Sequence, residues 1–164
     1  MKSWAFTMCL LLAASRASAQ GDCPTARSAR LLPAITPVIG QSPMWITTGA
    51  GPLAWKGPKE PVVVLWVRDL SVRGPALLSG QQRGGGAKVR FSRPGSLSAF
   101  RDEQMKLDSL GLKPSKATPE ELRKYSFHQT EVWFPEAGCY ELSARVGREQ
   151  SVIVMRVGAP ATKK

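Results

Sequence analysis

Hydrophobic and polar side chains alternate most regularly near the C-terminal end of the sequence. The positions on one side of this alternation are Tyr140, Leu142, Ala144 and Val146. The positions on the other side are Cys139, Glu141, Ser143 and Arg145. A period of two residues is typical of a β-strand with one buried face. We therefore predict that the first set faces the core and that the second set faces outward.

A second strand follows this one after a short interruption. The segment GRE at 147–149 breaks the alternation, and the run SVIVMRV at 151–157 is rich in β-branched residues. Two such runs joined by a short loop with glycine predict a β-hairpin. Pro135 and Gly138 mark a corner where the chain enters it. Because a hairpin alone is marginal in water, other strands must cover its apolar face.

The most apolar run outside the N-terminal segment is VVVLWV at 62–67. It predicts a central strand that is covered on both faces, or one whose second face is shielded by the N-terminal arm. A buried helical turn is the alternative for a short apolar run, but the β-branched residues and flanking prolines favour a strand. Shorter strands are expected at 44–48, 76–79, 87–91 and 127–134, with Ala87, Val89 and Phe91 facing inward. The segment GQQRGGG at 80–86 lacks the spacing of a phosphate-binding loop and predicts a hairpin loop.

One short helix is expected near 119–125. Thr118 suits the N-cap position, Pro119 suits the first helical position, and Glu121 completes a capping box. The preceding segment 93–117 is open, because its apolar residues fit one side of a helix or a strand with a loop. These residues are Leu97, Phe100, Leu107 and Leu110.

About seven short strands separated by turn signals, with one short helix, indicate an all-β antiparallel sandwich. We place this domain at 44–158. A Pro-rich extended arm over 20–43, with an edge strand near 31–39, precedes it, and a disordered tail at 159–164 follows. The sequence shows no internal repeat and no second domain.

The N-terminal segment 1–19 has the pattern of a secretory signal peptide. Lys2 provides a basic start, residues 5–14 are apolar, and Ala17, Ser18 and Ala19 form a small-residue cleavage site. Cleavage there leaves Gln20 first in the exported chain. A retained N-terminal helix is the alternative. Elsewhere no apolar run is long enough to span a membrane.

Three cysteines are present, and Cys9 leaves with the signal. In an oxidising compartment we expect Cys23 and Cys139 to form a disulfide. Two free thiols or an intermolecular bridge are the alternatives. Because Cys139 lies on the outward side of its strand, the bridge would tie the N-terminal arm across the outside or the edge of a sheet.

The corner Phe134-Pro135, followed by Gly138-Cys139-Tyr140, resembles the closing strands of immunoglobulin-like domains in bacterial exported proteins. It is most similar to small, uncharacterised, secreted proteins that share a Trp-containing central strand (here 65–67), a Gly-Pro step (74–75) and a Gly-rich hairpin. The resemblance covers 44–157. It implies an immunoglobulin-like antiparallel sandwich and an exported location, without an activity. The inter-sheet disulfide of antibodies is not implied, because Cys139 directly precedes the tyrosine.

The formal net charge is +11, and the basic residues are scattered along the chain without a dense run or a nucleic-acid motif. Nucleic acid is therefore a poor partner for this exported chain. Attraction to an anionic cell surface fits the charge, and a solvated basic surface without a partner is the alternative.

Catalytic and metal-binding residues are sparse. His128 is the single histidine; no nucleophile motif lies near it, and we expect it to face solvent on a strand. One histidine and two bonded cysteines do not supply a metal site, and no cofactor motif is present. Two carboxylate pairs exist, Asp102-Glu103 and Glu120-Glu121. A small envelope hydrolase that uses His128 or a carboxylate pair is the alternative function.

Tryptophans offer a binding hypothesis. Sandwich domains use exposed aromatic rings as flat contact surfaces, whereas a tryptophan on a central strand packs in the core. We expect Trp66 in the core and name Trp55 and Trp133 as candidate exposed binding aromatics. The favoured function is an exported, non-catalytic binding or scaffolding module of the bacterial cell envelope, periplasmic or secreted. Its partner would be an envelope protein, a peptide or a glycan; a strand donor or acceptor in envelope assembly is a third option.

Overall fold

The structure of the protein is a computed structural model. It describes residues 23–24, 28–29, 37–47, 53–96, 101–107, 111–115 and 117–158. The predicted signal peptide at 1–19 and the predicted tail at 159–164 lie outside these residues, as do Leu97, Phe100 and Leu110.

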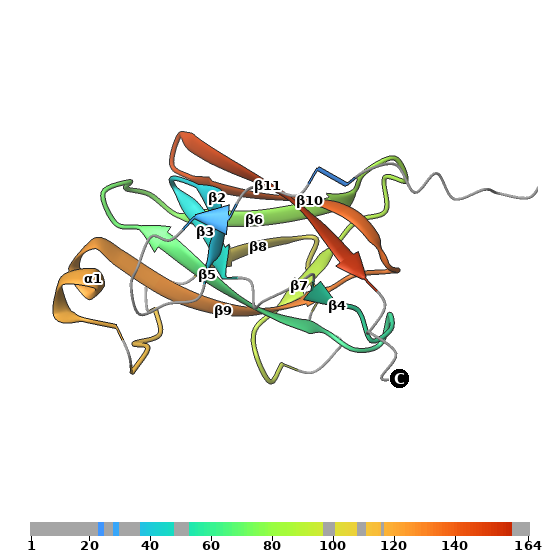
Figure 1. Cartoon of the computed structure of the whole chain (residues 1–164), viewed down its shortest axis with the longest axis horizontal. Coiled ribbons are helices and arrows are strands. Elements are labelled where there is room, and N and C mark those ends of the chain that lie inside the picture. The colour runs from blue at the N-terminus through green and yellow to red at the C-terminus, as the bar shows by residue number, and fades with distance from the viewer. Residues whose placement is uncertain are drawn as a thin grey trace, which may run out of the picture.

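The described chain forms two β-sheets in two layers, with one short helix at one end (Figure 1). In spatial order, the first sheet holds β1 (Ser28–Ala29), β2 (Val38–Gln41), β3 (Met44–Thr47), β5 (Val62–Asp69), β9 (Tyr125–Trp133) and β7 (Arg90–Ser92). The second holds β4 (Leu53–Ala54), β11 (Glu149–Gly158), β10 (Gly138–Val146), β6 (Ala76–Gln82) and β8 (Gln104–Leu107). Neighbouring strands are antiparallel except β4 and β11, which are parallel. The predicted all-β sandwich is confirmed.

The C-terminal hairpin has the predicted orientation. Tyr140 pairs with Met155 and Leu142 pairs with Ile153 in the register of β10 and β11. The four residues predicted to face inward are each 0% exposed: Tyr140, Leu142, Ala144 and Val146. The returning strand begins at Glu149, earlier than predicted, because a tight turn at Gly147 and Arg148 lets pairing start at once. Gly147 has a φ of 58°, a conformation that favours glycine.

The main core lies between the two sheets and includes Trp66, which is 0% exposed as predicted. A second, smaller cluster lies on the outer face of the first sheet and holds Val38, Trp45, Val67 and Phe127. Leu122 and Ala117 pack against it from the helix and the segment before it. This cover reaches only one end of β5, since Val63 at the other end is 55% exposed. The predicted arm therefore shields one end of the second face, through Val38, and cover along the whole strand is not found.

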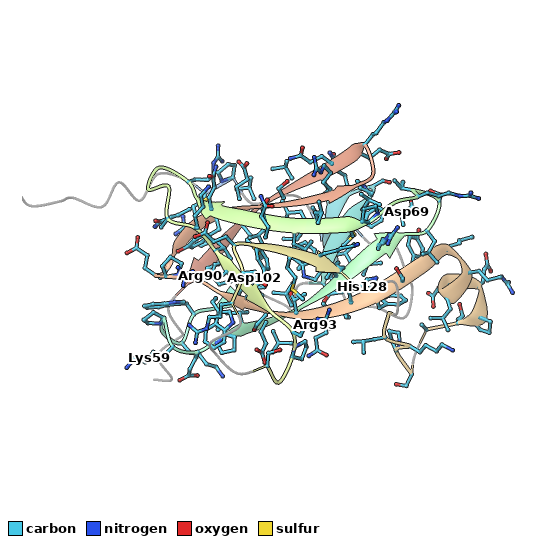
Figure 2. The ribbon with its side chains drawn as sticks, turned by 180° about the vertical axis from the view of Figure 1, so that it is seen from behind. Lys59, Asp69, Arg90, Arg93, Asp102 and His128 are labelled. Carbon is cyan, nitrogen blue, oxygen red and sulfur yellow. A yellow bond between two sulfur atoms is a disulfide. The ribbon has the colours of Figure 1, made fainter. Side chains whose placement is uncertain are left out.

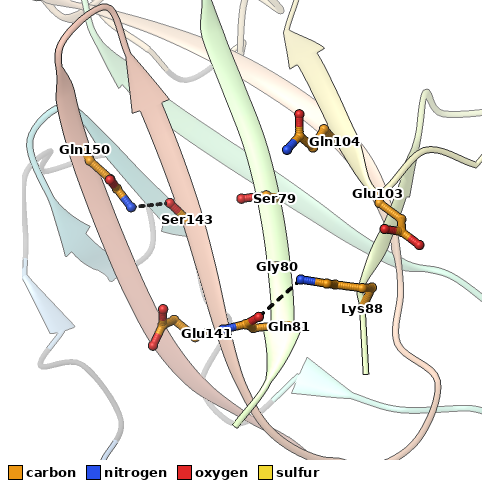
Figure 3. A pocket seen from close by; sticks show the side chains of 9 residues that line it. All are labelled: Ser79, Gly80, Gln81, Lys88, Glu103, Gln104, Glu141, Ser143 and Gln150. Atoms are coloured by element: carbon orange, nitrogen blue, oxygen red, sulfur yellow. Dashed lines mark hydrogen bonds between the residues drawn. The ribbon is translucent and has the colours of Figure 1, made fainter. Parts of the chain in front are cut away.

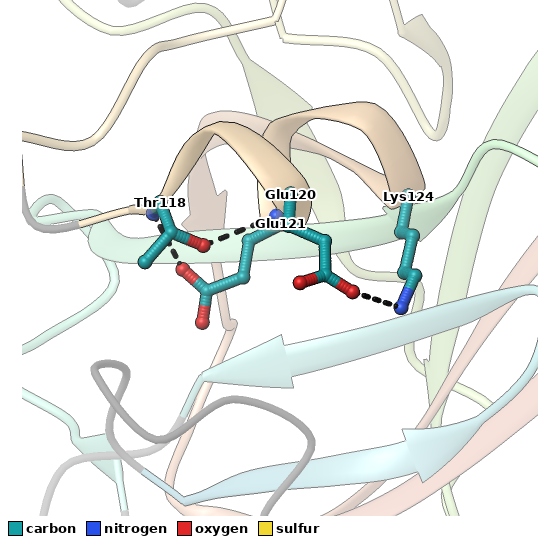
Figure 4. Close-up of polar contacts among 4 residues, drawn as sticks. All are labelled: Thr118, Glu120, Glu121 and Lys124. Atoms are coloured by element: carbon teal, nitrogen blue, oxygen red, sulfur yellow. Dashed lines mark hydrogen bonds and ion pairs between the residues drawn. The ribbon is translucent and has the colours of Figure 1, made fainter.

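The short helix α1 (Pro119–Lys124) begins with the predicted capping box (Figure 4). The hydroxyl of Thr118 accepts a hydrogen bond from the Glu121 amide at 3.2 Å, and the Glu121 carboxylate accepts one from the Thr118 amide at 2.7 Å. Glu120 forms an ion pair with Lys124 at 2.7 Å on the exposed side. The helix ends before Tyr125 because that residue already belongs to β9.

The predicted N-terminal arm contributes strands to the first sheet. β2 pairs with β3, and its residues Val38 and Ile39 are buried, so the sandwich extends into the range 20–43. The predicted disulfide is confirmed: Cys23 is bonded to Cys139, with 5.5 Å between their Cα atoms. Because Cys139 lies on the outer side of β10, the bridge crosses the outside of the second sheet, as expected.

The segment from 76 to 92 passes from one sheet to the other. β6 continues to Gln82, beyond the start of the predicted loop, because Tyr140 and Glu141 of β10 pair with Gln82 and Gln81. The chain then turns through the glycines, and an isolated bridge joins Gln81 to Lys88. After Lys88 it crosses to β7 in the first sheet, while Val89 and Phe91 point into the core as predicted. Within the open segment 93–117, residues 104–107 form a strand.

Candidate functional site

His128 is buried rather than solvent-facing, which corrects the prediction from its strand context. Its exposed fraction is 5%, and its Nε2 atom lies 3.0 Å from the hydroxyl oxygen of Ser126. The alternation of β9 places His128 on the same side as Thr130, which bonds to Trp66 in the core. The covered face of β9 depends on the packing of the second sheet, and the local sequence did not reveal it.

The two sequence-adjacent carboxylate pairs do not converge on a catalytic arrangement in the structure. Glu120 and Glu121 serve the helix, through the ion pair and the capping box. Asp102 takes part in a backbone bridge to Phe91, and its side chain is exposed. Glu103 lines a cleft, where it shares a wall with residues of other strands.

The two tryptophans proposed as exposed binding residues lie at the same end of the sandwich, on either side of Phe134. The Trp55 indole is half-buried and donates a hydrogen bond of 3.1 Å to the Phe134 carbonyl. Trp133 is only 8% exposed, so its prediction as an exposed ring was wrong. The physical reason is that the side chain of Arg101 lies on the ring and covers it.

A chain of hydrogen bonds fixes the indole of Trp133. Its Nε1 atom donates to the Ser92 hydroxyl at 2.9 Å, and that hydroxyl donates to the Glu131 carboxylate at 2.8 Å. The other carboxylate oxygen of Glu131 accepts the Gly95 amide at 3.0 Å. These hydrogen bonds hold the indole in one orientation, so its face is a fixed surface on which another side chain can stack.

The side chain of Arg101 stacks on the indole ring of Trp133. Its guanidinium carbon lies 3.3 Å from the centroid of the Trp133 ring, a cation–π contact. The Nε atom of Arg101 is buried and, in the described part of the chain, has no hydrogen-bond partner. The stack therefore orients a planar cation while leaving this donor without an acceptor. A buried donor in that state costs free energy that a bound acceptor would recover.

Arg101 and Trp133 line a cleft of about 420 Å³. We call it the basic cleft; its defining residues are Lys88, Arg90, Arg101, Trp133, Phe134 and Pro135. Glu103 is an acidic residue in its wall. Arg90 pairs with Trp133 in the register of β7 and β9, so the two side chains project on the same face. Figure 2 labels Arg90, Asp102 and Lys59 at this end of the molecule.

A second cleft, of about 250 Å³, lies on the outer face of the second sheet (Figure 3). We call it the polar cleft; its own residues are Ser79, Gln81, Gln104, Glu141, Ser143 and Gln150. Lys88 and Glu103 line both clefts, so the two clefts are adjacent. The amine of Lys88 donates to the Gln81 side chain at 3.3 Å, and Gln150 donates to the Ser143 hydroxyl at 2.7 Å.

A third cleft, of about 570 Å³, is more apolar and lies on the outer face of the first sheet. Val63, Leu65 and Leu112 line it. Residues 48–52, which connect two of its lining residues, Thr47 and Leu53, lie outside the described part of the chain.

The basic cleft is suited to binding an anionic group. Its lysine and two arginines outnumber its single carboxylate, and an arginine fork matches the geometry of a carboxylate or phosphate. Among the described residues no cluster of histidine, cysteine or carboxylate side chains fits a metal ion. Within the same residues, no helix has the length and apolar character needed to cross a membrane.

The sequence did not reveal the basic cleft, because its members come from distant segments. Arg90 and Arg101 appeared as part of a scattered basic surface. The only local signal was the alternation at 87–91, which turns Lys88 and Arg90 away from the core. That alternation does not say which strand Arg90 faces, and the pairing with Trp133 supplies the answer.

Comparisons with known proteins add nothing to this site: no family model matches the chain, and neither a curated protein nor a solved structure matches it.

Proposed function

We propose that this chain is an exported, non-catalytic binding module of the bacterial cell envelope and that it holds anionic groups of its partner in the basic cleft. The observation that carries the proposal is the stack of Arg101 on Trp133, with a buried Nε donor that has no acceptor in the described chain. A carboxylate or phosphate oxygen would supply the missing acceptor once a rotation of the Arg101 side chain exposes the Nε–H group. A charge-assisted hydrogen bond of this kind is stronger than a neutral one.

The surrounding charges support the same ligand chemistry. Lys88 and Arg90 line the same cleft as Arg101, and Glu103 is the single acidic residue among the residues that line it. A cleft with an excess of one sign concentrates the opposite ion near its surface. The interaction is screened by salt, so binding should weaken as ionic strength rises.

Export belongs to this proposal and rests on two observations. The Cys23–Cys139 bond is stable in an oxidising compartment such as the periplasm or the extracellular medium. The pattern of residues 1–19 is that of a secretory signal. The immunoglobulin-like character of the sandwich is likewise part of the proposal, supported by two packed sheets of mostly antiparallel strands.

The test is a titration with two simple anions, sodium glucuronate and inorganic phosphate, followed by nuclear magnetic resonance of the arginine Nε–H groups. We expect the Arg101 Nε–H signal to shift on titration, because the anion becomes its acceptor. Arg101→Lys keeps the charge but removes the planar fork and the stack, and a lost charge-assisted bond of about 1.5–3 kcal/mol predicts roughly 10- to 100-fold weaker binding.

Arg123→Gln is the matched control for charge. Arg123 is exposed on helix α1, away from the cleft, and its removal lowers the net charge by one unit. We expect it to leave both affinities nearly unchanged. The proposal is wrong if neither anion shifts the Arg101 signal, or if Arg123→Gln weakens binding as much as Arg101→Lys does.

A second candidate function, an envelope hydrolase, is favoured by one observation in the polar cleft. Glu103 and Glu141 both line it, although they are distant in sequence and differ from the predicted adjacent pairs. A glycosidase uses two carboxylates that flank the glycosidic bond it cleaves. Release of reducing ends from an acidic oligosaccharide by the wild type, but not by Glu141→Gln, would establish this function instead.

A further inference from the structure

We infer that the partner is a glycan with a sparse acidic group: the acidic sugar lies in the basic cleft, and the neutral sugars that follow it lie along the polar cleft. This inference rests on the proposed function and specifies its ligand. It begins from the adjacency of the two clefts, which share the lining residues Lys88 and Glu103. Lys88 is placed at the junction by its bridge to Gln81 and by the hydrogen bond from its amine to that side chain.

The polar cleft presents side chains, not backbone, to a ligand. It lies on the face of the second sheet, where β6, β10 and β11 are paired with one another. The backbone donors and acceptors in its floor are therefore used by the sheet. A peptide that binds by adding a strand needs a free sheet edge and pockets for alternate side chains. Of the strands that line the cleft, only β8 lies at an edge of the described sheet, and β6, β10 and β11 have neighbouring strands on both sides, so recognition over most of the cleft must come from hydroxyl, amide and carboxylate groups.

Several of these side chains have donors or acceptors that no described protein group uses. Within the described part of the chain, the side chains of Ser79, Gln104 and Glu141 make no hydrogen bond. Together they offer a hydroxyl, an amide and a carboxylate on neighbouring strands (Figure 3). A sugar carries several hydroxyl groups, each of which donates and accepts, so it can pair with all three kinds.

The distribution of charge distinguishes a glycan from an acidic peptide. Besides the shared Lys88 and Glu103, the basic cleft has two arginines, whereas the polar cleft has Glu141 and no further positive side chain. A peptide with an acidic residue at every position would bring carboxylates against these glutamates, and like charges repel. A glycan with one acidic sugar avoids this, because its neutral hydroxyls can donate to the glutamates. The two glutamates therefore select against a uniformly acidic chain.

The ligand must be an oligosaccharide rather than a single sugar. From β8 to β11 the second sheet has three strand-to-strand steps. At the usual spacing this is about 14 Å of surface. The polar cleft draws residues from all four of these strands, with Gln104 on β8 and Gln150 on β11.

The experiment compares four probes on the purified full-length chain: glucuronic acid, xylotriose, xylotriose bearing one glucuronic acid, and tetraglutamate. We expect the acidic xylo-oligosaccharide to bind at least 10-fold more tightly than glucuronic acid, by calorimetry. Xylotriose alone should bind weakly, because it has no group for the basic cleft. Tetraglutamate should bind no better than glucuronic acid.

Two variants separate the clefts. Ser79→Ala with Ser143→Ala removes two hydroxyls from the polar cleft without adding bulk to it. It should reduce the affinity for the acidic oligosaccharide to that for glucuronic acid, without changing the latter. Glu141→Gln removes a repelling charge and should strengthen tetraglutamate binding several-fold. Near-ultraviolet circular dichroism checks that each variant is folded.

The outcomes distinguish this inference from the proposed function. If no acidic probe binds, or if Arg101→Lys weakens none of them, the proposed function itself is wrong. If acidic probes bind in an Arg101-dependent way but the oligosaccharide gains nothing over glucuronic acid, only the glycan inference fails. If tetraglutamate binds as tightly as the acidic oligosaccharide, the ligand is an acidic peptide and the inference is overturned.

Discussion

The indole nitrogen of Trp66 donates a hydrogen bond of 2.9 Å to the hydroxyl oxygen of Thr130 inside the core. Both residues are 0% exposed. They belong to β5 and β9, which are neighbours in the first sheet. The indole N–H can only donate, so without Thr130 it would be a buried donor with no acceptor. This pair therefore lets the first sheet bury a large polar-tipped side chain at its centre.

Replacement of Thr130 by valine tests this relationship. The substitution conserves the branched shape and removes only the acceptor. The unsatisfied indole should cost about 1–3 kcal/mol in the free energy of unfolding. Urea denaturation measures the effect. Thr47→Val is the matched control, because Thr47 donates a longer bond, of 3.3 Å, to a carbonyl in a half-buried position. A Thr130→Val protein as stable as the wild type would contradict the argument.

The buried hydroxyl of Tyr140 should make the folded protein less stable at alkaline pH. Burial raises the pKa of its hydroxyl, which also donates a hydrogen bond of 2.8 Å to the Glu136 carbonyl. In the unfolded chain the pKa is about 10. Because the folded pKa is the higher one, the contribution of Tyr140 is fully present below about pH 10 and is lost as pH rises through the folded pKa.

Tyr140→Phe isolates this contribution. At pH 7 the variant should be less stable by about 0.5–1.5 kcal/mol, because it loses one hydrogen bond. Between pH 9 and 11 its stability should fall less steeply than that of the wild type. Urea denaturation at a series of pH values gives both curves. Parallel curves over the alkaline range would show that Tyr140 is not the responsible group.

The Cys23–Cys139 bond should contribute strongly to stability. It joins residues separated by 116 positions in the chain. A cross-link over a loop of this size restricts the unfolded chain, and its removal typically costs about 2–5 kcal/mol. The double variant Cys23→Ser, Cys139→Ser should therefore show a lower urea midpoint than the oxidised wild type. The reducing agent dithiothreitol should lower the wild-type midpoint to the same value and leave the variant unchanged. An oxidised wild type no more stable than the variant would refute the contribution.

The local parts of this fold were predictable from the sequence. The inward set of β10 follows from a period of two, which depends only on neighbouring residues. The capping box of Thr118 and Glu121 is equally local, and both predictions are confirmed. The disulfide was predictable for another reason: only Cys23 and Cys139 stay after the expected cleavage.

The errors concern what covers each strand. His128 and Trp133 lie on opposite faces of β9, and both were expected to be exposed. His128 is buried on the side of β9 that carries Thr130, and Arg101 covers Trp133. The basic cleft was missed for the same reason, since it depends on the pairing of β7 with β9. Such pairings join segments far apart in the chain, and alternation within one segment does not encode them.

Gly147 provides the sharpest backbone test. It has a φ of 58°, and a Cβ atom added there would lie 2.5 Å from the carbonyl oxygen of Arg73. Alanine would therefore pay for both the left-handed backbone and a clash with a neighbouring turn. The backbone cost alone is about 1–2 kcal/mol, and the clash should add to it. Thermal and urea unfolding should both show Gly147→Ala as markedly destabilised.

Gly84 is the matched control, because it also has a positive φ, of 79°, but no atom lies within 4 Å of an added Cβ. Gly84→Ala should show the backbone cost without the clash. The difference between the two variants then measures the close approach of the β10–β11 turn to the segment that enters β6. Equal destabilisation of the two variants would mean that this turn can move aside, and that its contact with Arg73 does not constrain the hairpin.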